Sequence, residues 1–138
     1  MFALDTRILV VDDMPSIREL VRNHLKAMGF KNIYEADDGD VALRLLVQMN
    51  TANTPIQLII CDWNMPNMTG LTLLKQIRGT QEWAKTPFVL LTSESEREQV
   101  TEAILSGANQ YVVKPFSARI FEEKLTAVYA KLKSTNSI

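Results

Sequence analysis

The sequence predicts an α/β fold, a doubly wound (βα)5 arrangement in which helices cover both faces of a five-stranded parallel sheet. Two observations lead to this prediction. Five short apolar runs alternate along the chain with five longer stretches whose apolar residues recur at helical spacing. Three of the runs also lack the polar alternation of a strand with one wet face, so they are expected to be buried on both faces. Right-handed crossovers between parallel strands then place helices on both sides of the sheet.

Each predicted strand ends at polar or turn residues. The clearest is Leu58–Cys61, which stops at Asp62 and breaks at Pro66. Its short length and β-branched residues favour a strand over a helix, so Asp62 is expected at the carboxyl end of a buried strand. The five predicted strands are Ile8–Val11, Asn32–Ala36, Leu58–Cys61, Pro87–Leu91 and Gln110–Val113.

Each strand is followed by a predicted helix. Pro15 and Ser16 begin the first helix, where Glu19, three places after Ser16, indicates a capping box. Gly29 is the expected stop of this helix. The other helices are predicted from apolar stripes within Val41–Met49, Leu71–Ile77, Glu96–Ser106 and Phe121–Leu132.

No linker, internal repeat or low-complexity tract divides this alternation. We therefore expect a single domain over residues 1–138, with its core at about residues 7–133 and short tails at both ends. Asn50–Pro55 is expected to be a polar loop, and Ser134–Ile138 a frayed tail.

The composition is that of an ordinary globular protein and excludes several classes of function. The 15 basic and 16 acidic side chains leave a net charge of −1, so the overall charge favours neither nucleic acid nor an anionic membrane as a partner. Cys61 is the only cysteine, which rules out an internal disulfide and indicates a reducing compartment. No stretch approaches the roughly 20 apolar residues that span a bilayer, and the first residues lack the apolar core of a signal peptide. A cytoplasmic location is expected.

Polar side chains follow four of the predicted strands. Because the carboxyl ends of parallel strands meet at one edge of the sheet, these side chains are expected to converge. Three carboxylates there would repel one another by about 4 kcal/mol per pair at 4 Å with an effective dielectric near 20, which one lysine does not offset. A hard divalent cation such as Mg²⁺ would balance them. The converging residues are Asp12 and Asp13 after the first strand, Asp62 after the third, Thr92 after the fourth and Lys114 after the fifth.

The two other groups indicate what the cation would serve. The hydroxyl of Thr92 and the ammonium of Lys114 can bind an anion that also contacts the metal. A carboxylate, a divalent cation, a lysine and a threonine together indicate phosphoryl transfer onto the carboxylate, with an aspartyl phosphate as the covalent intermediate.

Four stretches of the sequence carry a resemblance to a known family. They are Val10–Asp13, Cys61–Met68, Leu91–Glu94 and Tyr111–Phe116. Through them the chain, from about Ile8 to Leu132, is similar to the receiver domain of two-component response regulators, and within that family to the single-domain chemotaxis regulators. The resemblance implies the flavodoxin-like strand order 2-1-3-4-5 and one Mg²⁺ per domain. It also implies a signalling switch rather than an enzyme, one that catalyses only its own phosphorylation and slow dephosphorylation.

The resemblance implies a role for each residue that matches the family's motifs. Asp62 would be the phosphoacceptor. Asp13, Asp62 and the backbone carbonyl of Asn64 would bind Mg²⁺ directly, and Asp12 would hold the metal partly through water. Lys114 would pair with the phosphoryl group.

Further positions resemble the switch of the family. Thr92 would move to hydrogen-bond a phosphoryl oxygen, and Tyr111 would leave a solvent-facing rotamer for the space that Thr92 vacates. Asn64 and Glu94 match the positions that tune hydrolysis of the acyl phosphate, and the Lys114–Pro115 bond would be cis.

The implied partner-binding surface is the face formed by the fourth helix, the fifth strand and the fifth helix. The implied partners are a histidine kinase (CheA-like) and the flagellar motor switch protein, with a dedicated phosphatase as an open alternative. Neither nucleic acid nor membrane insertion is implied, and the protein is expected to act as a monomer. Residues expected on this surface are Ser95, Arg97, Val100, Tyr111, Val113 and Lys124.

Other functions stay open at this point. Within signalling, the chain could be a stand-alone phosphorelay shuttle or a regulator of a non-flagellar partner. A phosphatase of the haloacid dehalogenase type also uses a strand-end aspartate with Mg²⁺, but the second aspartate of its pattern is Asn64 here. A flavodoxin-like cofactor carrier would need a phosphate-binding loop where Asp12 and Asp13 stand, and these carboxylates would repel a phosphate.

Two residues near the motifs are expected to be structural. His24, the only histidine, lies beside the apolar stripe of the first helix with no acidic neighbour in sequence, so we expect a satisfied structural role. Trp63 adjoins Asp62 but offers no chemistry, and is expected to pack in the fold or to contact a partner.

Overall fold

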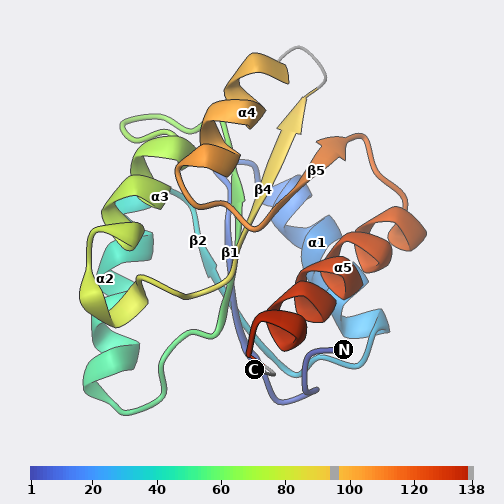
Figure 1. Cartoon of the computed structure of the whole chain (residues 1–138), viewed down its shortest axis with the longest axis horizontal. Coiled ribbons are helices and arrows are strands. Elements are labelled where there is room, and N and C mark those ends of the chain that lie inside the picture. Colours follow the sequence, from blue (N-terminus) through green and yellow to red (C-terminus); the bar gives the residue numbers. More distant parts are fainter. Residues whose placement is uncertain (94–96, 137–138) are drawn as a thin grey trace.

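Figure 1 shows the computed structural model, which describes residues 1–93 and 97–136. The strands are β1 (Arg7–Val11), β2 (Asn32–Ala36), β3 (Leu58–Asp62), β4 (Phe88–Ser93) and β5 (Gln110–Lys114). The helices are α1 (Pro15–Ala27), α2 (Gly39–Thr51), α3 (Gly70–Arg78), α4 (Arg97–Leu105) and α5 (Ala118–Asn136), with a short 3-10 helix, η1 (Gln81–Trp83), before β4. The strands are parallel in the order β2-β1-β3-β4-β5, which confirms the predicted fold class and strand order.

Each face of the sheet is covered by its own layer of helices. α1 and α5 cover one face, and α2, α3 and α4 cover the other (Figure 1). Successive strand residues point to opposite faces, so Val10 packs with α1 and α5 while Val11 packs with the other layer. With both faces covered, every residue of β3 is buried. This double burial is why the central strands are apolar without alternation.

The strand register brings the carboxyl ends of the strands level with one another. The residue pairs at this edge are Val11 with Cys61, Asp62 with Leu91, and Ser93 with Lys114. Asp12 directly follows β1, so it leaves the sheet beside Asp62, the last residue of β3. The predicted convergence of strand ends is thus a property of the register.

The first helix begins without the predicted capping box. Its N-cap is Met14, which makes no side-chain capping bond, and Pro15 takes the first turn, where its missing N–H is not needed. Ser16 and Glu19 therefore lie inside the helix and cannot bond reciprocally at its end. The Met14 N–H instead donates to Asp12 Oδ1 at 2.9 Å. One carboxylate of the candidate site thus also fixes the turn between β1 and α1.

Two helices run further than predicted. α2 continues to Thr51, whose hydroxyl donates to the Val47 carbonyl at 2.9 Å, so the polar loop is shorter than Asn50–Pro55. α5 continues to Asn136, so residues 134–136 are helical rather than a frayed tail, and 137–138 lie outside the described residues. Apolar spacing marks only the turns that pack on the core, and backbone hydrogen bonds extend a helix beyond them. None of the helices within the described ranges combines the length and apolar character needed to cross a membrane.

The chain before β1 is packed against the fold. Thr6 is buried, and the Lys31 N–H donates to the Leu4 carbonyl at 3.3 Å. The ring of Phe2 meets that of Tyr129 edge-on, with centroids 5.2 Å apart. The predicted N-terminal tail is therefore tied to the layer formed by α1 and α5.

Candidate functional site

Three carboxylates gather at the carboxyl edge of the sheet. Asp12 and Asp13 follow β1, and Asp62 ends β3. Each can offer one oxygen to a common centre, and these oxygens lie within 4.8 Å of one another. Asp12 is fully buried and Asp62 is 6% exposed, whereas Asp13 faces solvent. We call these three residues the acidic cluster.

The ammonium of Lys114 reaches the acidic cluster from the end of β5. Its Nζ lies 2.7 Å from Asp62 Oδ1 and 3.6 Å from Asp12 Oδ2. Burial by itself would lower the pKa of Lys114, but the hydrogen bond to Asp62 and the charges of both carboxylates outweigh burial and raise it. The lysine is therefore held in its charged form, and its one positive charge faces three carboxylates.

Burial disfavours the charged forms of the two inner carboxylates. It raises the pKa of Asp12 more than the Met14 N–H and Lys114 lower it. Burial likewise raises the pKa of Asp62 against the hydrogen bond from Lys114, and the charges of Asp12 and Asp13 raise it further. The acidic cluster thus carries more negative charge than the surrounding protein balances.

The acidic cluster fits a divalent metal ion. Asp12 Oδ2 is buried and has no hydrogen-bond partner among the described residues, and a cation would supply that partner. Hard cations prefer carboxylate and carbonyl oxygens, and the exposed side at Asp13 leaves them access to water. The predicted convergence of Asp12, Asp13 and Asp62 on a metal-binding arrangement is therefore present in the fold.

A glycine fixes the loop that follows Asp62. The Gly70 N–H donates to the Trp63 carbonyl at 2.8 Å, which folds the loop between β3 and α3 back on itself. A Cβ at Gly70 would collide with the backbone carbonyl oxygen of Asp62, so this close approach requires glycine. From the sequence Gly70 is only a turn residue, because nothing in the pattern reports that the chain returns to Asp62. Trp63 is 5% exposed and packs in the core, in keeping with its expected packing role.

The predicted switch residues lie on β4, which adjoins β3, and on β5, which adjoins β4. Thr92 is almost fully buried near the end of β4, and its hydroxyl donates to the Ser93 carbonyl at 3.3 Å. Tyr111, on β5, is half-buried, with the Lys124 ammonium 4.8 Å from the centroid of its ring. This cation–π contact joins β5 to α5 and brings together two residues of the predicted partner surface.

The other predicted positions differ in how fully the structure describes them. Asn64 is exposed two residues after Asp62. Half-buried positions on α4 and β5 are Val100 and Val113. Outside the described part of the chain lie Glu94, Ser95 and the side chain of Arg97, whose backbone begins α4.

The segment after Lys114 packs against α1. The Lys114–Pro115 bond is cis, as the resemblance implies. His24 lies against the rings of Phe116 and Phe121, with centroid distances of 5.9 and 5.7 Å. This contact agrees with the structural role expected for His24. The histidine is not satisfied, however, because its buried Nε2 has no hydrogen-bond partner within the described residues.

Comparisons with known proteins agree with this geometry. The family model for the response regulator receiver domain matches residues 8–126. Chemotaxis protein CheY-3 of Vibrio cholerae is 42% identical over 126 residues, which cover 91% of this chain and 93% of that protein. Chemotaxis protein CheY of Pseudomonas aeruginosa is 39% identical over 126 residues, 91% of this chain and 98% of its own length. The solved structure of chemotaxis protein CheY4 of Vibrio cholerae matches with a TM-score of 0.77 and 34% identity, over 90% of this chain and 98% of that one.

The matched segment includes all five strands apart from the first residue of β1, and it contains both the acidic cluster and Lys114. Because one family model matches this whole segment, the phosphatase and the cofactor carrier no longer stand as alternatives. The match supports a signalling protein rather than a true enzyme. The chain belongs to the response regulator receiver domain family.

Proposed function

We propose that this receiver accepts a phosphoryl group on Asp62 in a Mg²⁺-dependent reaction and thereby switches a partner-binding surface. The family implies a histidine kinase as the phosphodonor. The observation that carries the proposal is Asp62, an almost buried carboxylate 2.7 Å from an ammonium and beside two further carboxylates. These groups supply the nucleophilic oxygen, the countercharge and the metal ligands that phosphoryl transfer onto a carboxylate requires.

The acidic cluster would hold Mg²⁺, together with the backbone carbonyl of Asn64. When bound, the cation would neutralise charge on the carboxylates and on the phosphoryl oxygens. An all-oxygen donor set favours Mg²⁺ over metals that prefer sulfur. The neighbouring Cys61 offers no competing ligand, because burial raises the pKa of its thiol well above the ordinary value and keeps it neutral. Lys114, held charged beside Asp62, can pair with a phosphoryl oxygen.

The phosphoryl group would act on the partner surface through Thr92 and Tyr111. Thr92 is buried beside the acidic edge, and Tyr111 pairs with Leu90 on the adjoining strand. A hydrogen bond from Thr92 to the phosphoryl group would alter the packing next to Tyr111 and its contact with Lys124. Shifting a two-state balance from 1:99 to 99:1 needs roughly 5.5 kcal/mol, which several charge-assisted bonds to a dianion can supply.

The affected surface would include positions on α4, β5 and α5 and in the segment before α4. These are Ser95, Arg97, Val100, Tyr111, Val113 and Lys124. Asn64 and Glu94 would set how fast water hydrolyses the acyl phosphate. We also propose that residues 1–138 form one domain, since all five strands belong to one sheet, and that the protein acts as a monomer.

Chemotaxis is the output that the relatives favour. The chemotaxis proteins of Vibrio cholerae and Pseudomonas aeruginosa match over more than nine-tenths of their own lengths. We therefore propose a CheA-like kinase as donor and the flagellar motor switch protein as target. A stand-alone phosphorelay shuttle, with or without a dedicated phosphatase, is the second candidate within signalling, because it would need the same acidic cluster and Lys114 but a different target.

The phosphoacceptor is tested by incubation with acetyl phosphate and Mg²⁺, followed by intact mass. We expect a gain of one phosphoryl group in the wild type, no gain in Asp62→Asn, and no gain when EDTA replaces Mg²⁺. Asp40→Asn is the matched control, because Asp40 is an exposed carboxylate in the first turn of α2 and should leave the gain intact. Absence of the gain in the wild type, or its persistence in Asp62→Asn, contradicts the proposal.

The output is tested by binding to the flagellar switch protein with and without an acyl-phosphate mimic. Binding that strengthens with the mimic, and that weakens in Lys124→Ala, supports the motor as target. Equal binding with and without the mimic excludes the flagellar motor as the target and leaves the phosphorelay shuttle as the candidate function.

A further inference from the structure

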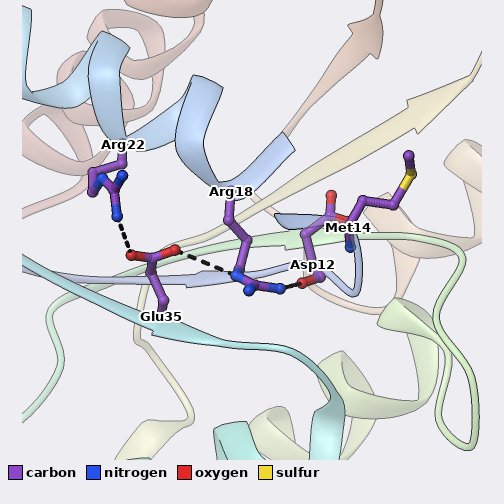
Figure 2. Close-up of polar contacts among 5 residues, drawn as sticks. All are labelled: Asp12, Met14, Arg18, Arg22 and Glu35. Carbon is purple, nitrogen blue, oxygen red and sulfur yellow. Dashed lines mark hydrogen bonds and ion pairs between the residues drawn. The ribbon is translucent and has the colours of Figure 1, made fainter. Parts of the chain in front are cut away.

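Two arginines of α1 hold a glutamate of β2, and one of them also reaches the candidate site (Figure 2). Arg18 Nε lies 3.3 Å from Glu35 Oε1, and Arg22 Nη1 lies 2.8 Å from Glu35 Oε2. Arg18 Nη1 donates to the backbone carbonyl of Asp12 at 2.6 Å. The fork of Arg18 thus joins an edge-strand carboxylate to the first residue of the acidic cluster.

The contacts of Asp12 leave one of its oxygens without a hydrogen bond among the described residues. Its N–H donates to the Ala36 carbonyl at 3.1 Å, and its own carbonyl accepts from Arg18. Its Oδ1 accepts from the Met14 N–H at 2.9 Å. Its Oδ2 is buried without a hydrogen-bond partner among the described residues, with Lys114 Nζ 3.6 Å away. The backbone and the side chain of Asp12 are therefore both fixed, and Oδ2 is the carboxylate oxygen that remains to bind a cation.

We propose that Arg18, oriented by Glu35, is a positioning residue that fixes Asp12 for metal binding. The inference rests on the proposed Mg²⁺ site. Arg18 touches the backbone of Asp12 and not its carboxylate, so it acts through Asp12. The side chain of Arg18 is 18% exposed, against 35% for Arg22, so the contact at Asp12 is the better shielded from water. Partners that orient metal ligands typically change metal affinity when they are removed.

The charge of Arg18 allows positioning to be separated from simple electrostatics. The positive charge of Arg18, which contacts the backbone of Asp12, repels Mg²⁺ at the acidic cluster, so loss of this charge alone should tighten Mg²⁺ binding. Loss of positioning should weaken Mg²⁺ binding. Electrostatics and positioning therefore predict opposite changes in Mg²⁺ affinity for the same substitution.

Arg22 provides a matched control. It lies one turn further along α1 and pairs with the other oxygen of Glu35, but among the described residues it has no hydrogen bond to Asp12. Arg18→Met and Arg22→Met remove the same charge and the same kind of ion pair to Glu35. Only the first removes the contact with the Asp12 carbonyl.

Mg²⁺ binding is measured by isothermal titration calorimetry on the full chain. We expect the dissociation constant to rise about tenfold in Arg18→Met and to stay level or fall in Arg22→Met. Raising the Mg²⁺ concentration should restore phosphorylation of Arg18→Met by acetyl phosphate toward the wild-type level, because the substitution weakens Mg²⁺ binding and removes no reacting group. Equal or tighter Mg²⁺ binding in Arg18→Met overturns the inference, as does equal weakening in both variants.

Arg18→Lys keeps the inference testable if Arg18→Met does not fold. Lysine preserves the charge, so electrostatics alone predicts unchanged binding, whereas one ammonium cannot reproduce the guanidinium fork. We expect weaker Mg²⁺ binding, and unchanged binding overturns the inference. Identical Mg²⁺ binding in wild type and Asp62→Asn would overturn the proposed function itself. If Asp62→Asn weakens Mg²⁺ binding but the Arg18 variants do not, only the inference about Arg18 is overturned.

Discussion

The two edges of the sheet use polar groups in opposite ways. At the amino edge, Arg78 ends α3 and donates from Nη2 to the Gly107 carbonyl at 2.9 Å and from Nη1 to the Trp83 carbonyl at 3.2 Å. Arg78 Nη2 also donates to Asn109 Oδ1 at 3.0 Å, which in turn accepts the Phe88 N–H at 2.8 Å. Each donor in this group thus has an acceptor, and the hydrogen bonds join the segments that lead into β4 and β5.

The carboxyl edge instead brings like charges together. Asp12 and Asp62 share the ammonium of Lys114, Asp13 adds a third carboxylate, and Asp12 Oδ2 has no hydrogen-bond partner among the described residues. Such an arrangement lowers stability unless a ligand completes it. The contrast indicates that the amino edge stabilises the fold, whereas the carboxyl edge keeps unfavourable charge for a cation and a phosphoryl group.

The largest effect on stability is expected at the amino edge. Arg78→Ala leaves the Gly107 and Trp83 carbonyls without their donor and should lower the free energy of unfolding by about 3 kcal/mol in urea titration. Arg119→Ala is the control, because its side chain is 84% exposed and its ion pair among the described residues is with Glu123, one turn along α5. Equal losses in the two variants would remove the stabilising role of the amino edge.

Phosphorylation separates this loss from function. The folded fraction of Arg78→Ala should still accept a phosphoryl group from acetyl phosphate, because Arg78 contacts none of the acidic cluster. A folded Arg78→Ala protein that is not phosphorylated would show that the two edges are coupled.

An intermediate effect is expected at Gly70, where stability and function should fall together. Gly70→Ala forces a Cβ against the Asp62 carbonyl and should cost about 2 kcal/mol and weaken Mg²⁺ binding. Gly79→Ala is the matched control, since its Cβ would come no closer than 3.4 Å to the Lys75 carbonyl oxygen. Urea unfolding and calorimetry measure the two quantities, and equal behaviour of the variants would argue against a special role for Gly70.

The smallest expected effect is on the pH dependence of stability without divalent cations. Burial raises the pKa of Asp12 in the folded state, so the folded protein binds this proton more tightly than the unfolded chain does. The ionised group therefore lowers stability progressively as the pH rises through its folded pKa. Asp12→Asn lacks this ionisation, so its stability relative to wild type should grow by about 1 kcal/mol between acidic and neutral pH. A relative stability that falls with pH would contradict the sign of the shift.

The parallel sheet explains why much of the site could be predicted from the sequence. Once the strands are parallel, their carboxyl ends meet, so Asp12, Asp62 and Lys114 at the ends of β1, β3 and β5 identify one place. Gly70 and Arg18 were not identified, because their roles depend on contacts with a backbone carbonyl that no spacing reports. The predicted capping box failed because Met14 rather than Ser16 is the N-cap of α1, so Ser16 lies inside the helix.

The most direct test of the contrast between the edges compares unfolding free energies of wild type and Asp12→Asn in EDTA and in Mg²⁺. In EDTA the variant should be more stable by about 1 kcal/mol, because a buried charge is removed while its amide oxygen can still accept the Met14 N–H. Mg²⁺ at a hundredfold excess over its dissociation constant should stabilise the wild type by about 2.7 kcal/mol and the variant far less, which reverses their order. A variant that is less stable in EDTA, or that gains as much from Mg²⁺ as the wild type, would contradict the account.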